Sequence, residues 1–239
     1  MARSWRSALS FREVLIIQKM LTLFHTAASN RDLFDALLKQ IAPDVPVRHV
    51  VDEAILREAR AAGAVTDTMI ARVDSEMANV LRNASFVLCT CSTIGGLAEQ
   101  ASERVLRVDR PMAERAVSLG SRILVAATLQ STLGPTQSLL MDVACAMNRP
   151  IHLTELFIES AWPYFESGDK DGYAREIARC VEDAVTRDAY DAVVLAQASM
   201  YEAEALCAHL PVPVMSSPRL GLEAALKKYR NREYDLSDK

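Results

Sequence analysis

The segment that decides the fold is Ser85-Phe86-Val87-Leu88-Cys89-Thr90-Cys91-Ser92. It has a weak counterpart in Ala192-Val193-Val194-Leu195-Ala196-Gln197-Ala198-Ser199. In each segment a short apolar run passes into a polar turn and then into a stretch with helical spacing. Apolar runs of this length are typical of strands buried on both faces of a parallel sheet. The repeat predicts two similar halves, residues 20–108 and 121–215, which are expected to face each other across a cleft.

Five further apolar runs extend this pattern along the chain. They alternate with stretches in which apolar residues recur every three or four positions, the spacing of one helix face. Strands that alternate with helices predict an α/β fold with short, mainly parallel sheets flanked by helices. The five runs are residues 20–24, 47–51, 123–127, 151–157 and 212–215.

This pattern also suggests a division of the chain into parts. We expect residues 1–18 to be an N-terminal extension, because the first convincing strand follows them. The first lobe is assigned residues 19–115 together with 217–239, and the second lobe residues 116–216. No Gly/Ser-rich linker separates the two lobes, so they are expected to pack tightly.

Composition excludes several classes of protein. The chain has 239 residues, 50% of them hydrophobic, with 27 Lys and Arg against 31 Asp and Glu. This mild acidity without a basic block argues against a nucleic-acid partner. No apolar run approaches the roughly 18–20 residues of a membrane span. The odd number of cysteines, five, without disulfide-framework spacing fits a reducing, cytoplasmic location.

Small polar residues follow nearly every predicted strand. In open parallel sheets, ligands bind just outside the carboxyl ends of the strands, so these residues are candidates for substrate binding. Any single Ser or Thr among them has the alternative role of a helix cap. The candidates are His25, Thr26, Ser92, Thr93, Thr128, Ser131, Thr132 and Ser199.

Cys91 carries the most chemistry of these turns. A thiol between a strand end and a helix N-terminus lies beside unpaired N–H groups and the positive end of the helix dipole, which favours the thiolate. The same N–H groups suit a carboxylate, and Gly95-Gly96 is expected to let a ligand approach the backbone. A thiol beside a bound carboxylate can move a proton at the adjacent carbon. The alternative is a small buried apolar residue, the more probable role of Cys89.

A metal site is poorly supported, since no His or second Cys pair lies near Cys91 in the sequence. Trp162, Tyr164 and Phe165 are candidates for an aromatic wall or lid of the cleft. Core packing or dimer contacts are equally good interpretations of these three side chains. The absence of a GxGxxG or Walker loop weakens a nucleotide-binding function.

The pattern resembles the aspartate/glutamate/hydantoin racemase superfamily, which includes maleate isomerases and arylmalonate decarboxylases. Four segments carry the resemblance: residues 23–26, the Cys91-Ser92-Thr93 turn, residues 123–132 and residues 193–200. The resemblance implies two pseudo-symmetric α/β lobes with the active site between them. It also implies cofactor-independent chemistry at the carbon next to the carboxylate of a small acid or amino-acid-like substrate, and a homodimer or higher homo-oligomer.

The sequence departs from this family at the second lobe. In members that use two bases, one cysteine from each lobe flanks the reacting carbon, and Cys91 matches the first. The second position holds Gln197, or Ala198 if the register slips by one, and neither side chain is an acid or a base. The chain therefore resembles a divergent member that lacks the second cysteine.

Three functions stay open at this point. The chain is expected to be an isomerase of the racemase type, or a lyase that decarboxylates its substrate and delivers a proton to one face. Decarboxylases of the superfamily also keep one cysteine, but in the other lobe. The alternative is a catalytically degenerate protein that binds a small carboxylate.

Overall fold

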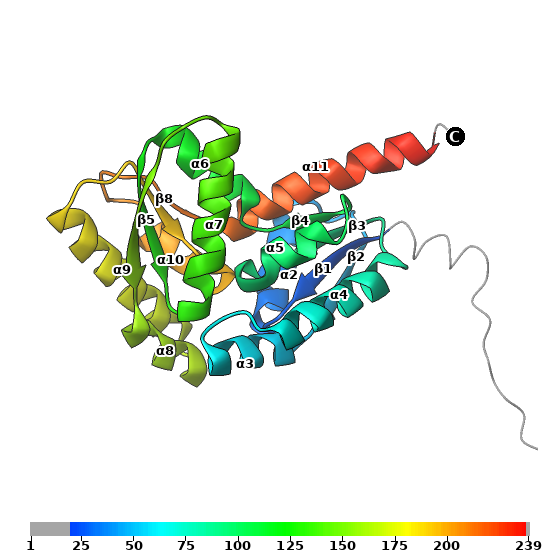
Figure 1. Ribbon diagram of the computed structural model, residues 1–239, viewed down its shortest axis with the longest axis horizontal. Helices are drawn as coiled ribbons and strands as arrows, with labels where there is room; N and C mark the ends of the chain where they lie inside the picture. The colour runs from blue at the N-terminus through cyan, green and yellow to red at the C-terminus, as the bar shows by residue number, and fades with distance from the viewer. Residues whose placement is uncertain (1–19, 238–239) are drawn as a thin grey trace, which may run out of the picture.

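Eight parallel strands in two separate sheets form the framework of the computed structural model, which describes residues 20–237, with side chains up to residue 232. The predicted N-terminal extension, residues 1–18, lies outside these described residues. Figure 1 shows the two sheets in two lobes that lie side by side. Within residues 20–237 no helix is both long enough and apolar enough to cross a membrane.

The first sheet is built from the N-terminal half of the chain, and the last helix returns to cover it. Its strands lie in the order β2-β1-β3-β4. The elements of this lobe are β1 (Leu21–His25), α2 (Ser29–Ile41), β2 (Val47–Val51), α3 (Glu53–Ala62), α4 (Asp67–Leu81), β3 (Phe86–Cys89), α5 (Ser92–Gln100), β4 (Val105–Arg107) and α11 (Ser217–Ser237).

The second sheet repeats the same strand order, β6-β5-β7-β8. Its elements are α6 (Arg110–Leu119), β5 (Arg122–Ala127), α7 (Gln130–Ala146), β6 (His152–Phe157), the 3-10 turn η1 (Glu159–Ala161), α8 (Trp162–Ser167), α9 (Lys170–Arg187), β7 (Ala192–Leu195), the 3-10 turn η2 (Ala198–Met200), α10 (Tyr201–Leu206) and β8 (Val214–Ser216). The shared order and the parallel pairing confirm the predicted two-lobed α/β fold.

One strand was not anticipated from the sequence. β4 has only three residues, and its last residue is Arg107, so it shows no apolar run. It pairs in parallel with β3, and all three of its side chains are buried. The burial of an arginine there follows from a buried ionic partner, which local sequence patterns do not reveal.

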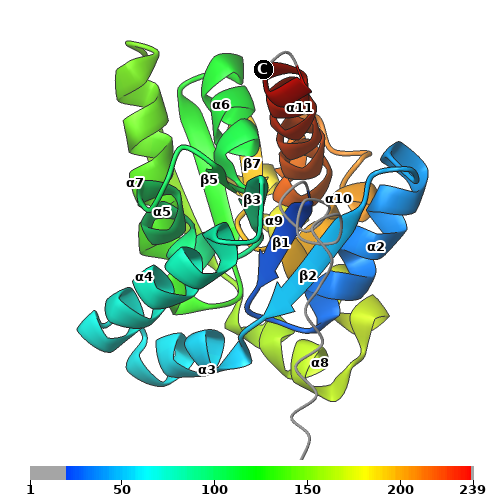
Figure 2. The same ribbon diagram turned by 90° about the vertical axis from the view of Figure 1, so that its right-hand side faces the viewer.

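Both faces of each sheet are covered by helices, which explains the continuous apolar strands. The first sheet packs against α2 and α11 on one face and against α3, α4 and α5 on the other. The second sheet packs against α6 and α7 on one face and against α9 and α10 on the other. In Figure 1 and Figure 2, α11 runs from the junction of the lobes along the first lobe.

The core assigns α6 to the second sheet. Met112, Ala113, Ala116 and Val117 lie in one buried cluster with side chains of β5 and β7. The first part of this helix falls in the residues that the sequence analysis gave to the first lobe. The core of the second lobe therefore begins with the residues of α6, and not at residue 116 inside that helix.

Gly221 fixes the contact between α11 and the first sheet. A Cβ added at this residue would lie 2.3 Å from the carbonyl oxygen of Val108 and 2.6 Å from its Cγ2. We expect Gly221→Ala to lower the free energy of unfolding by about 1–3 kcal/mol, because the helix must move away from the sheet. Urea unfolding followed by circular dichroism measures this change.

The control uses an exposed position of the same helix. At Lys227, the alanine variant should be more stable than the glycine variant by about 1 kcal/mol, the ordinary difference in helix propensity. A Gly221→Ala protein that is more stable than the parent would show that α11 is not held at this contact.

Candidate functional site

The candidate site lies at the carboxyl ends of the central strands of both sheets. In each sheet the chain first adds a strand on one side of the central strand and then on the other, which opens a crevice at that point. In the first lobe this crevice lies between β1 and β3, followed by Thr26 and Cys91. In the second it lies between β5 and β7, followed by Thr128 and Gln197.

Two adjoining cavities occupy the region between the lobes. The inner chamber has a volume of about 40 Å³, and its lining includes Cys91, Thr93, Thr132 and Gln197. The outer pocket has a volume of about 450 Å³ and is lined by α2 and α3 from the first lobe and by α8 from the second. Thr26, Trp162, Phe165 and Ser199 line both cavities, so the chamber lies at the inner end of the pocket.

The thiol of Cys91 lies in the inner chamber, at the residue just before α5. Burial raises the pKa of this thiol, although hydrogen bonds from Thr26, Thr93 and the backbone N–H of Ile94 act in the opposite direction. The expected thiolate is therefore wrong for this protein, because desolvation outweighs the helix N-terminus. At neutral pH Cys91 is a thiol that carries a proton.

Cys89 is excluded as the chamber thiol. It lies in the hydrophobic core between the first sheet and its helices, and its Sγ donates a hydrogen bond to the carbonyl oxygen of Cys91, at 3.8 Å. Burial raises the pKa of Cys89 as well. Cys89 has the structural role of a small apolar residue.

Gln197 faces Cys91 from the second lobe, as one wall of the same chamber. Its Oε1 accepts hydrogen bonds from the backbone N–H of Thr128 at 2.6 Å and of Leu129 at 3.2 Å. It also accepts one from Thr128 Oγ1 at 3.0 Å. The side-chain oxygen is thus fixed against the turn between β5 and α7.

A chain of hydroxyl groups supports Gln197 from behind. Tyr173 Oη lies 2.9 Å from Thr128 Oγ1 and 3.0 Å from Ser199 Oγ. Burial raises the pKa of Tyr173 to about 12, so its hydroxyl stays protonated. Across the chamber, Thr93 Oγ1 and Thr132 Oγ1 lie 3.2 Å apart and join the two lobes directly.

His25 does not line either cavity. Its ring is fully buried, with Nδ1 2.8 Å from Thr90 Oγ1 and Nε2 2.9 Å from His49 Nδ1. Burial and the neighbouring His49 lower the pKa of His25 to about 3. The prediction that His25 binds substrate is not supported, because the side chain points into the lobe and supports the strand ends.

The other predicted residues divide into two groups. Thr26, Ser92, Thr93, Thr132 and Ser199 line the inner chamber together with Cys91 and Gln197. Thr128 and Ser131 line neither cavity, although both residues are buried. Thr128 instead contacts Gln197 and Tyr173, because its position at the end of β5 places it behind the chamber wall.

Asn30 and the aromatic residues complete the lining. The sequence analysis did not single out Asn30, which follows Ser29 and was indistinguishable from a polar residue at a helix start. Its side chain is buried and lines both cavities. Trp162 and Phe165 form the expected aromatic wall, with ring centroids 4.6 Å apart, whereas Tyr164 is exposed and lies outside the lining.

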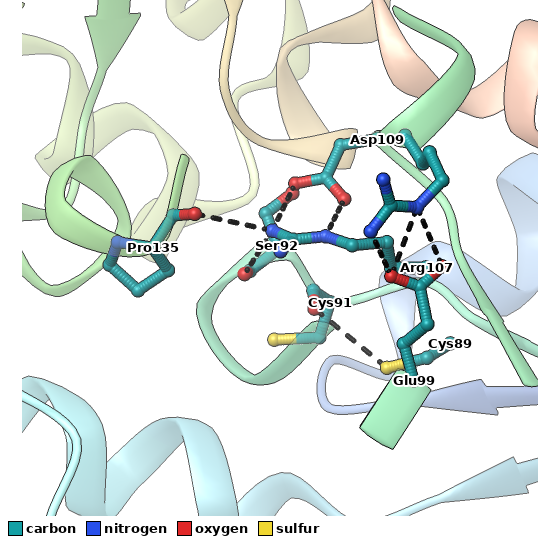
Figure 3. A network of polar contacts seen from close by, with 8 residues as sticks. Cys89, Cys91, Ser92, Glu99, Arg107, Asp109 and Pro135 are labelled. Atoms are coloured by element: carbon teal, nitrogen blue, oxygen red, sulfur yellow. Dashed lines mark hydrogen bonds and ion pairs between the residues drawn. The ribbon is translucent and has the colours of Figure 1, made fainter. Parts of the chain in front are cut away.

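A buried ion pair lies directly behind the chamber. Arg107 Nε donates to Asp109 Oδ1 at 2.7 Å, and its Nη2 donates to the backbone oxygens of Ser92 and Pro135 at 3.4 and 3.3 Å. Figure 3 shows Arg107 between these three partners. Burial opposes the charge of Arg107, but Asp109 raises its pKa, so the guanidinium stays charged. One side chain therefore ties α5 of the first lobe to α7 of the second.

Gly95 and Gly96 leave room for the Arg107 side chain of this ion pair. A Cβ at Gly95 would lie 3.0 Å from Arg107 Nε, and a Cβ at Gly96 would lie 3.3 Å from its Nη1. The sequence analysis expected Gly95-Gly96 to let a ligand approach the backbone. The structure corrects this expectation, because the guanidinium of Arg107 takes up the space.

The inner chamber is lined by neutral side chains. No Asp, Glu, Lys, Arg or His side chain within the described part of the chain lines it. Acidic and basic side chains line the outer pocket instead, among them Arg60, which donates to Glu166 at 2.6 Å. Within residues 20–237, no three His, Cys, Asp or Glu side chains lie close enough together to hold a metal ion.

Solved structures with this geometry identify the fold. Glutamate racemase from Thermus thermophilus, in complex with beta-chloro-D-alanine, is similar with a TM-score of 0.65 and 20% identity, over 92% of this chain and 82% of that chain. Aspartate racemase from Picrophilus torridus has a TM-score of 0.60 and 15% identity, over 88% and 98%. The chain therefore has the same fold as these two racemases.

Arylmalonate decarboxylase shares the same fold. It is similar with a TM-score of 0.54 and 14% identity, over 88% of this chain and 92% of that chain. No protein-family model matches the sequence, and a comparison with curated proteins finds no match either. The similarity thus shows the architecture, and the chemistry has to be argued from the residues of the chamber.

The Arg107–Asp109 pair yields a test of the junction between the lobes. We expect Asp109→Ala to lower the free energy of unfolding by about 3–5 kcal/mol, because it leaves Arg107 buried and unpaired. The double variant Arg107→Met/Asp109→Leu should cost less than this single change, since no charge is then buried. Urea unfolding measures both.

The matched control is the surface pair Arg122–Asp188, whose N···O distance of 2.6 Å is similar but whose side chains are half exposed. Asp188→Ala should leave the unfolding midpoint unchanged. If Asp109→Ala had as small an effect, the buried pair would not hold the lobes together.

The lowered pKa of His25 predicts acid sensitivity. Between pH 6.5 and about 3 the unfolded chain binds a proton at this position and the folded chain does not. The free energy of unfolding should therefore fall as pH falls through this range, by up to about 1.4 kcal/mol per pH unit from this group. His25→Gln, which does not titrate there, should flatten the acid limb of stability measured by urea unfolding.

The comparison is the parent protein, measured over the same pH range. An unchanged slope in His25→Gln would show that His25 accepts a proton without loss of the fold.

Proposed function

We propose that this protein is a cofactor-independent lyase or isomerase of the racemase-superfamily type that acts at the carbon next to a carboxylate. The observation that carries the proposal is the protonated thiol of Cys91 in a buried chamber, opposite a side chain that is neither acid nor base. The racemase and decarboxylase neighbours support the same class of chemistry.

Cys91 acts in this proposal as a general acid. When the substrate is a malonate-type acid, the bond between its central carbon and one carboxylate breaks, and carbon dioxide leaves. The electron pair of that bond forms an enediolate, and the Cys91 proton then passes to the carbon. The hydrogen bonds from Thr26, Thr93 and Ile94 stabilise the thiolate that remains until a proton from water restores the thiol.

The enediolate needs hydrogen-bond donors that are already in place. The hydroxyl groups of Thr93 and Thr132 line the chamber, and so does Ser92, whose Oγ is buried without a hydrogen-bond partner among the described residues. Donors fixed in a site that excludes water stabilise developing negative charge strongly, because they need no reorganisation. These side chains are the proposed oxygen-binding groups.

One thiol favours a reaction that uses one face of the carbon. Removal of a proton from one face and return from the other needs a second acid or base, and Gln197 provides neither. We therefore place decarboxylation, or another step that ends in protonation from one side, ahead of racemization. A racemase would need a further proton carrier beyond the residues of the chamber.

A binding protein without turnover is the second candidate. The specific observation in its favour is the raised pKa of Cys91, because a protonated thiol serves equally well as a packed apolar group. In that case small carboxylates would raise the melting temperature, and no bond to the reacting carbon would change.

Deuterium incorporation tests the proposal directly. The protein is incubated in heavy water with a panel of malonates, amino acids, hydantoins and dicarboxylates, and the products are analysed by mass spectrometry. We expect deuterium at the carbon next to the carboxylate, with loss of carbon dioxide from malonate-type acids. Cys91→Ala should slow this incorporation about 100-fold or more, the usual contribution of a general acid.

Cys145→Ala is the matched control, since Cys145 is exposed on α7 and away from both cavities. It should leave the rate of incorporation unchanged. Incorporation that survives in Cys91→Ala would refute the role of the thiol. Thermal stabilisation by an acid that never incorporates deuterium would favour the binding protein.

A further inference from the structure

We propose that Gln197 determines substrate class: it selects acids whose reacting carbon carries an oxygen-containing acceptor and rejects those that carry an ammonium group. The proposal rests on the proposed function, because it concerns the same chamber. It starts from the contacts of a single amide.

The orientation of the Gln197 amide is fixed by its partners. Two backbone N–H groups and one hydroxyl group, from Thr128 and Leu129, converge on its Oε1. A flipped amide would place its NH2 against these two N–H donors, so that arrangement is excluded. The NH2 group is therefore on the other side of the amide, and its Nε2 makes no hydrogen bond to another described residue.

This NH2 group lies at the chamber. Gln197 is among the residues that line the chamber together with Cys91, and its side chain is 9% exposed. An amide nitrogen is a donor only, with two N–H bonds to offer. A substrate oxygen satisfies it, whereas a substrate ammonium group, itself a donor, leaves both groups unpaired.

The rest of the chamber offers no anionic partner for an ammonium group. Its described lining holds no carboxylate and no histidine. The acidic side chains Glu53, Glu166 and Glu202 line the outer pocket and not the chamber. A buried ammonium without an anionic partner is strongly disfavoured, so an amino acid would have to enter without the charge pairing that it requires.

Oxygen atoms, in contrast, meet several donors. Besides Gln197 Nε2, the chamber offers the amide of Asn30 and the unpartnered hydroxyl of Ser92. The structure thus fits a carbon acid with two oxygen-bearing groups near the reacting carbon. Gln197 holds one of them from the side opposite the thiol.

Binding of matched pairs of acids tests this selection. Each pair differs only by an amino group on the carbon next to the carboxylate: malonate with aminomalonate, and succinate with aspartate, both enantiomers of aspartate included. Dissociation constants are measured by calorimetry at pH 8 on full-length Cys91→Ala protein, which removes the proposed turnover. We expect each unsubstituted acid to bind at least about tenfold more tightly than its amino derivative.

Gln197→Glu is the decisive variant. The new carboxylate can keep the three hydrogen bonds from Thr128 and Leu129 through one oxygen, and it presents an anionic acceptor to the chamber through the other. The preference should therefore invert, with amino acids gaining and the unsubstituted acids losing affinity. Gln197→Met, which removes both functions of the amide, should lose the discrimination without inverting it.

Three results would overturn the proposal. They are equal or tighter binding of the amino acids by the Cys91→Ala protein, an unchanged preference in Gln197→Glu, and no binding of any of the acids. Because the assay measures binding alone, it is independent of deuterium incorporation. Thiol-dependent incorporation together with a preference for amino acids would overturn the role of Gln197 and leave the proposed function in place.

Discussion

The buried ion pair of Arg107 and Asp109 is the constraint on which the two lobes depend. Neither charge reaches water, and the same guanidinium contacts backbone oxygens at Ser92 and Pro135. These two residues belong to the helices that border the chamber from opposite lobes. This ionic group, together with the contact between Thr93 and Thr132, thus joins the lobe of the thiol to the lobe of the amide. At the mouth of the outer pocket a second bridge, Arg60 with Glu166, is half exposed and contributes far less.

The sequence was sufficient for the architecture because the chain repeats its local signal. Apolar runs that end in small polar turns occur in both halves, and this pattern places Cys91 and Gln197 at equivalent ends of two sheets. The pattern failed where a residue is defined by distant partners. Nothing in the local sequence marks Arg107 and Asp109 as a buried pair, and Gly95-Gly96 was interpreted as a ligand contact because the guanidinium that packs against these glycines comes from β4.

The protonation state of Cys91 also depends on distant parts of the fold that the local sequence does not reveal. A helix N-terminus beside Cys91 is visible in the sequence and favours a thiolate, but the depth of the chamber is a property of the whole fold. Desolvation decides the outcome and keeps the proton on sulfur. His25 is a second example. Its position at a strand end suggested a ligand contact, but burial keeps its ring neutral, and the ring forms a hydrogen bond with Thr90 instead. The first lobe carries the protonated thiol of Cys91, and the second lobe carries the fixed amide of Gln197.

The position of α11 has a consequence for how the chain folds during synthesis. The second sheet is made by one continuous segment, whereas the first sheet needs both the earliest strands and the last helix, whose residues Leu222, Leu226 and Tyr229 fill its core. The contacts between α2 and α11 join residues far apart in the chain, such as Gln40 and Arg219, 179 positions apart, and such contacts form slowly because a long loop must close. The lobe that carries the thiol is therefore completed only after α11 has been synthesised, whereas the strands of the lobe that carries the amide are complete at β8.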